Sequence, residues 1–105
     1  MIRLHGVPPT HLTFQALDAV RLPHASTTRH CPGIAPSDSP ASPFGPEASA
    51  LFGAVGLDLS RTAFLSQVHG AETRFVERGG HAGTGDILLT ISPGLPLAVF
   101  SADCL

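Results

Sequence analysis

Two side chains that can bind a metal or attack a substrate stand 35 positions apart (104 minus 69) in the second half of the chain. They are His69, within Gln-Val-His-Gly, and Cys104, which directly follows an apolar run and an aspartate. One His and one Cys supply two of the three protein ligands of a typical catalytic zinc site. The residues alone name no third ligand, and each of the two taken singly is more often structural than catalytic.

Composition limits the classes of partner. With 105 residues, of which 43% are hydrophobic, the chain has the material for one small domain. Its formal net charge is −2, and its six Lys and Arg residues are scattered, which argues against binding to nucleic acid or an acidic membrane surface. No apolar stretch reaches 18 residues and the amino terminus is polar, so we expect a soluble, cytoplasmic protein with no membrane partner.

The two cysteines, Cys31 and Cys104, have no export signal beside them. A pair of cysteines in such a chain is weak evidence for a disulfide. Of the two alternatives, a disulfide between them or two reduced thiols, we therefore expect reduced thiols.

A loop and a helix occupy the middle of the chain. Five prolines with Ser, Gly and Asp predict an irregular loop over about 31–46. The Pro-Glu pair that follows suits the first turn of a helix, which we predict over 46–55 with Leu51, Phe52 and Val55 on its buried side.

Short apolar segments bounded by Gly, Pro or polar residues predict strands at 63–68, 73–76, 86–91 and 97–100. The last of these lacks polar alternation, which predicts a strand covered on both faces. The glycine-rich stretch 79–85 is predicted to be a loop, and it lacks the Lys and the following helix of a phosphate-binding P-loop. One helix and four strands indicate an α+β or α/β fold.

Four motifs occur in an order known from one protein family: HxxxTR at 24–29, QVHG at 67–70, GDILLT at 85–90 and LAVFSADC at 97–104. With these motifs the sequence resembles the YfiH-like family, also called the laccase-domain or multicopper polyphenol oxidoreductase family. Its members are regarded as purine nucleoside phosphorylases and deaminases. The resemblance covers the chain from about residue 20 onward.

The resemblance implies a layered fold with a central mixed β-sheet flanked by helices, of which residues 1–105 would be the N-terminal part of a single domain. It also implies a zinc site in which His69 and Cys104 are catalytic ligands. A second His, in a C-terminal half that this chain lacks, would be the third. Zinc held in this way keeps an open position for water, and the substrates would be a nucleoside and phosphate.

Other site residues follow from the same resemblance. Gln67 and Asp103 would orient the substrate or the ligands, and Arg29, the last residue of HxxxTR, would grip phosphate or ribose. Where relatives carry a Gly-rich turn after this motif, the chain has Cys31-Pro32-Gly33, and the family's Asn-Arg pair before the helix has no counterpart.

Alternatives stay open at this point. Imidazole and thiolate also suit copper, but the six histidines contain no His-x-His pair, so we favour zinc and do not expect a multinuclear copper polyphenol oxidoreductase. His69 could instead activate Cys104 in a metal-free hydrolase. The chain could also be a truncated, non-catalytic fragment that needs a partner, and an apolar strand exposed at 97–100 would then lower its solubility.

Overall fold

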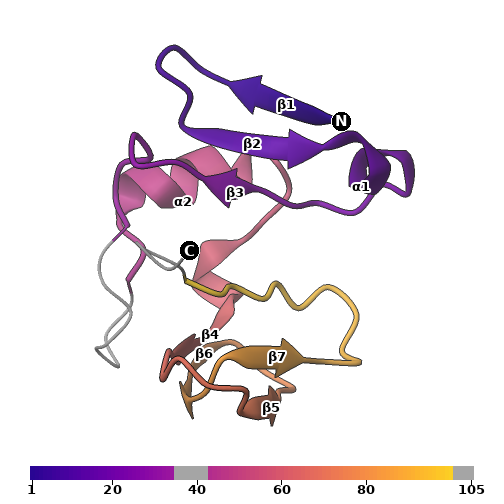
Figure 1. Cartoon of the computed structure of the whole chain (residues 1–105), viewed down its shortest axis with the longest axis vertical. Coiled ribbons are helices and arrows are strands. Elements are labelled where there is room, and N and C mark those ends of the chain that lie inside the picture. The colour runs from indigo at the N-terminus through magenta and orange to yellow at the C-terminus, as the bar shows by residue number, and fades with distance from the viewer. Residues whose placement is uncertain (35–42, 101–105) are drawn as a thin grey trace. The chain divides into compact units, whose positions relative to one another are not determined.

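The computed structural model describes residues 1–34 and 43–100, which fall into two compact units. The first unit comprises Met1–Ile34 and Phe44–Leu59, and the second includes the residues from Ser60 onward. Among these residues, the first unit has one small sheet and two helices, and the second has two pairs of strands, so the chain is α+β, one of the two predicted classes (Figure 1). That all residues belong to a single domain stays a prediction. Within the described ranges no helix has the length and hydropathy to cross a lipid bilayer.

The first unit contains an antiparallel sheet of order β1-β2-β3, formed by β1 (Ile2–His5), β2 (His11–Phe14) and β3 (Ser26–Thr27). The sequence did not predict this sheet. Its middle strand buries His11 and Thr13, whereas Leu12 is half-buried and Phe14 is exposed. The apolar residues of β2, Leu12 and Phe14, are on its less buried face. A search for apolar alternation would therefore assign the buried face of this strand to the wrong side.

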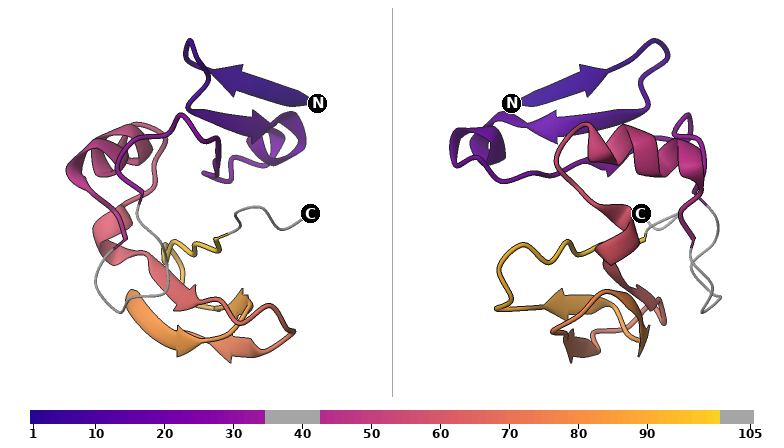
Figure 2. Two further views of the ribbon diagram at one scale, coloured as in Figure 1. Left: turned by 60° about the vertical axis from the view of Figure 1, so that its left-hand side comes forward. Right: turned by 180° about the vertical axis from the view of Figure 1, so that it is seen from behind.

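Helix α1 (Gln15–Ala19) follows β2, and helix α2 (Pro46–Gly53) lies against the sheet of the same unit (Figure 2). The predicted helix over 46–55 is confirmed, and it ends two residues earlier than expected. Its buried side chains are Ala48 and Phe52, while Leu51 and Val55 are only half-buried. The predicted buried face is therefore partly wrong.

Close backbone packing explains the burial of Ala48. A Cβ atom at Gly33 would lie 2.9 Å from the Ala48 nitrogen, so the segment before the loop runs directly over the helix. Ile34 and Phe44 form an antiparallel bridge there, and the Gly45 amide donates to the Gly33 carbonyl at 2.7 Å. This close contact favours a small residue, Ala48, on the helix. The spacing of large apolar residues does not indicate such a position.

The second unit holds two parallel strand pairs, β4 (Ala63–Ser66) with β6 (Gly80–Thr84) and β5 (Thr73–Phe75) with β7 (Ile87–Leu89). A single 3-10 turn, η1 (Leu59–Arg61), precedes β4. The strands predicted at 63–68, 73–76 and 86–91 are confirmed in shorter form. Burial concentrates in β4, whose first three residues, Ala63, Phe64 and Leu65, are all buried.

The prediction of a loop at 79–85 is wrong, because most of this stretch is strand β6. A Cβ at Gly79 would lie 2.1 Å from the carbonyl oxygen of Arg61, and Gly80 and Gly83 have φ angles of 98° and 101°. The pairing with β4 also contains a register shift, as expected of a bulge. These glycines permit a close backbone approach and a bulge, whereas propensity alone assigns them to a loop.

The prediction of a doubly covered strand at 97–100 is also wrong. Leu97 forms only a bridge to Ala63, beside hydrogen bonds in which Ala63 donates to Pro96 and Ala98 donates to Ala63. Exposure alternates along the segment, with Val99 69% exposed and Phe100 half-buried against Phe64. The described contacts therefore cover one face of the segment, and an apolar run without alternation does not guarantee burial on two.

Candidate functional site

His69 lies on an exposed turn that leaves the end of β4. Its φ angle is 60°, in the left-handed region that residues with a Cβ atom seldom adopt. We call residues Val68, His69 and Gly70 the 68–70 turn. A left-handed histidine in this turn needs a partner that holds the backbone in place.

The partner is Asp86, the aspartate of GDILLT, which stands directly before β7. Its Oδ1 accepts hydrogen bonds from the amides of Val68 at 3.2 Å and His69 at 2.8 Å, and its Oδ2 accepts from the amide of Gly70 at 2.9 Å. One carboxylate thus binds three successive backbone N–H groups and links two of the motifs.

The protonation of Asp86 follows from these contacts. Desolvation acts to raise the pKa of the carboxyl, but the amide hydrogen bonds from Gly70, Val68 and His69 outweigh it. The His69 charge adds to their effect, and the net pKa lies below its ordinary value. The group is therefore a carboxylate near neutral pH and keeps all three acceptor contacts.

Of the other predicted site residues, one lies near His69, one lies in the other unit and two lie outside the described residues. Gln67 is half-buried on the same segment as His69, immediately after β4. Arg29 is exposed in a turn after β3, in the other unit. Asp103 and Cys104 lie outside the described residues. The structure therefore groups Gln67 with His69, and the rest of the proposed ligand set stays a prediction.

No cluster of three or more His, Cys, Asp or Glu side chains suited to a metal occurs in residues 1–34 and 43–100. Of the two ligands that this chain is predicted to supply, only His69 falls in those ranges. Cys31 is a half-buried free thiol, and burial raises its pKa, which lowers its thiolate content.

A polar pair beside the turn was not foreseen from the sequence. Ser66, the last residue of β4, shares a hydrogen bond of 2.7 Å with the Nε2 of His81 on β6. The His81 ring also meets Phe64 edge-on. His81 lies in a glycine-rich stretch whose composition predicts a loop, so the sequence does not indicate its position next to β4.

His24, the first residue of HxxxTR, has a structural role in the first unit. Its Nε2 accepts from the Phe14 amide at 2.8 Å, and its Nδ1 lies 2.8 Å from the carbonyl oxygen of Leu22. An amide only donates and a carbonyl only accepts, so the proton must be on Nδ1. The neutral ring thereby ties the end of β2 to the segment that follows α1.

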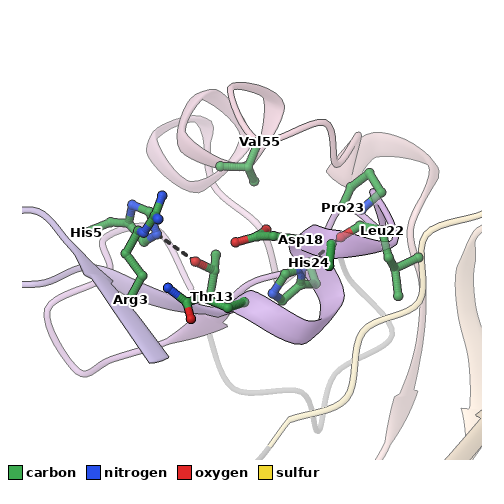
Figure 3. Close-up of a pocket in the computed structure, with 10 residues that line it drawn as sticks. Arg3, His5, Thr13, Asp18, Leu22, Pro23, His24 and Val55 are labelled. Carbon is green, nitrogen blue, oxygen red and sulfur yellow. Dashed lines mark hydrogen bonds between the residues drawn. The ribbon is translucent and has the colours of Figure 1, made fainter. Parts of the chain in front are cut away.

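The same unit carries an open cleft of about 500 Å³ between its sheet, α1 and the end of α2 (Figure 3). Arg3, His5, Thr13 and Asp18 contribute polar groups, and His5 Nε2 lies 2.8 Å from the hydroxyl of Thr13. The volume is in the range of small-molecule sites, and the lining offers both a cation and a carboxylate. No pattern in the sequence indicates this cleft.

Comparison with known proteins identifies the class. The family model described as multi-copper polyphenol oxidoreductase laccase matches residues 45–105. Because the match spans more than half of the chain, the protein belongs to this family, as the resemblance indicated. The match includes QVHG, GDILLT and LAVFSADC, but not HxxxTR. No curated protein and no solved structure matches the chain.

Proposed function

We propose that the protein acts on purine nucleosides as a metal-dependent enzyme, either by phosphorolysis or by deamination of adenosine-like substrates. The observation that carries the proposal is the 68–70 turn, in which Asp86 holds His69 in a left-handed conformation inside the family-matched region. Strained backbone that the surroundings hold in place is characteristic of functional sites.

The donor chemistry fits a metal such as zinc. His69 provides an imidazole on an exposed turn, and Cys104 would provide a thiolate. These two residues would be two of the ion's ligands, and the combination suits zinc, with copper the second choice. The chemistry that zinc would supply there is a water acidic enough to react near neutral pH and the polarisation of a substrate atom.

The remaining residues have roles in binding and orientation. The Arg29 guanidinium would bind phosphate through paired N–H donors, while Gln67 and Asp103 would orient the nucleoside. In phosphorolysis, a phosphate oxygen bonds to the ribose C1′ as the bond to the base nitrogen breaks, and the base leaves with a proton. In deamination, water adds to the purine carbon that bears the amino group, and ammonia leaves.

The description of the family supports a second candidate, copper-dependent oxidation of polyphenols. Multinuclear copper sites need many imidazoles, and the chain has six histidines without a His-x-His pair. The nucleoside reaction needs only the smaller ligand set proposed here, so we place it first. Two further alternatives, a metal-free thiol hydrolase and a non-catalytic fragment that needs a partner, are outcomes of the same experiment.

The test is nucleoside turnover by the full chain loaded with Zn²⁺, with adenosine and inosine in the presence and absence of phosphate. Products are separated by chromatography. His69→Ala and Cys104→Ala should each lower kcat/KM at least about 100-fold, because each removes a ligand. His30→Ala and Cys31→Ala are matched controls: His30 is exposed and Cys31 is in the first unit.

Wild-type turnover by either ligand variant would contradict the site. Turnover that survives a chelator but not a thiol alkylator would favour the metal-free hydrolase. Phenol oxidation by the Cu²⁺-loaded chain, without nucleoside turnover, would favour the copper enzyme. No turnover of any substrate by the wild-type chain would favour the non-catalytic alternative.

A further inference from the structure

We propose that Asp86 is the positioning residue of this site: its carboxylate fixes the 68–70 turn so that His69 is presented in one orientation. The inference rests on the proposed function for the role of His69 as a ligand. The hold of Asp86 on the turn is a separate matter that can be tested by itself.

The contact has the form of an internal anion site. Successive backbone N–H groups converge on a concave anion site when a residue of the turn is left-handed. Here His69 is the left-handed residue, and the amides of Val68, His69 and Gly70 point at one carboxylate. Hydrogen bonds to an ionised acceptor are stronger than those between neutral groups. The turn and its anion therefore stabilise each other.

The residue type at position 69 strengthens the inference. A left-handed backbone is unfavourable for a residue with a Cβ atom, and glycine would adopt it without strain. The chain has histidine here and places glycine next to it, at position 70. The strained conformation therefore indicates that the imidazole is needed at this point of the turn.

Asp86 can act as a fixed reference because its own backbone is anchored on two sides. Its amide donates to the carbonyl of Glu72 at 2.9 Å, and the preceding Gly85 donates to the carbonyl of Ser66 at 3.0 Å. Ser66 is the end of β4, and Glu72 directly precedes β5. The carboxylate is thus held by the same strands between which the 68–70 turn runs.

Gly85 makes this anchoring possible. Its φ is 153°, and a Cβ there would lie 3.2 Å from both the Glu72 oxygen and a methyl of Leu65. The glycine lets the chain pass close to β4 and deliver Asp86 to the turn. The sequence Gly85-Asp86 therefore combines a close approach with an anion, as the anchoring of the turn requires.

The test compares Asp86→Ala and Asp86→Asn with the wild-type full chain. Glu77→Gln is the control, because Glu77 is exposed in the same unit and accepts a hydrogen bond from Ser92 through its backbone carbonyl. Hydrogen exchange of the amides of residues 68, 69 and 70 is followed by NMR. Zn²⁺ affinity is measured by competition with a chelator, and the unfolding temperature is recorded for every variant.

In Asp86→Ala we expect exchange at the three amides to accelerate at least about tenfold, and Zn²⁺ affinity to fall about 10- to 100-fold, as for other partners of metal ligands. Asp86→Asn keeps one side-chain oxygen as an acceptor. Exchange should therefore accelerate only at the amides that are hydrogen-bonded to the oxygen that the substitution replaces. Glu77→Gln should match the wild type. A loss of zinc affinity at an unchanged unfolding temperature separates positioning from a general structural role.

Exchange at all three amides that stays at the wild-type rate in both variants would overturn the proposal. If Asp86→Ala does not fold, the selective release expected of Asp86→Asn decides the question. His69→Ala with wild-type zinc affinity would overturn the proposed function instead, while the exchange data would still settle whether Asp86 holds the turn.

Discussion

The imidazole rings of His5 and His11 stack in the first unit, with centroids 4.5 Å apart and planes 4° from parallel. Thr13 and Thr10 contact one ring nitrogen each, on His5 and His11 respectively. The remaining nitrogen of His11, Nε2, is buried and has no hydrogen-bond partner among the described residues. Stacked rings in this setting tolerate a second positive charge poorly.

Stability should therefore fall in mild acid. Burial, and then the charge of His5, lower the pKa of His11 from its ordinary 6.5. Below about 6.5 the unfolded chain binds a proton that the folded chain resists, so the free energy of unfolding decreases as pH falls from 6.5 toward the lowered pKa. His11→Phe should weaken this dependence, as measured by urea unfolding between pH 5 and about 7.5. An identical pH profile in the variant and the wild type would refute the assignment.

Phe52 is the main aromatic contribution of α2 to the core. It is buried, and its ring lies 6.4 Å from that of His11. Phe52→Ala should cost about 3–5 kcal/mol of unfolding free energy, since it leaves a cavity in a small core. Leu51→Ala, at the half-buried neighbour, should cost less in the same denaturant titration. Equal losses would mean that the buried face of α2 is misassigned.

Two glycines give a matched pair of substitutions. At Gly79 an added Cβ would meet the backbone of Arg61 at 2.1 Å, whereas at Gly53, the last residue of α2, nothing lies within 4 Å. Gly79→Ala should destabilise the protein by about 1–3 kcal/mol or more. Gly53→Ala should be neutral or stabilising by up to about 1 kcal/mol. Thermal unfolding distinguishes them, and a tolerated alanine at 79 would argue against the β6 pairing.

Whether the sequence predicts a given helix or strand depends on the residues within that element. Helix α2 was found because Pro46 marks its first turn and apolar residues follow. The strands β4 and β7 are indicated by apolar residues between polar or glycine boundaries, whereas β5 (Thr-Arg-Phe) has a single apolar residue and is indicated only together with the following Val76. Strand β2 was missed because it buries His11 and Thr13. Strand β6 was missed because its own glycines, Gly80 and Gly83, have positive φ angles and favour a loop by propensity.

The candidate site shows the same limit. His69 was singled out from its motif, and its exposed turn agrees with the expected junction after a strand. Asp86 enters the sequence analysis only as part of GDILLT, because its role depends on contacts to amides 16 to 18 residues away. No local pattern encodes such a contact. A motif aspartate between a glycine and a strand was the only signal for it.

The central claim is that His69 and Cys104 are both ligands of one metal ion. X-ray absorption at the zinc edge of the Zn²⁺-loaded full chain tests it most directly. We predict a sulfur ligand at about 2.3 Å and nitrogen at about 2.0–2.1 Å. The sulfur contribution should vanish in Cys104→Ala, and the nitrogen contribution should diminish in His69→Ala. A spectrum without sulfur in the wild type, or one that neither substitution changes, would contradict the account.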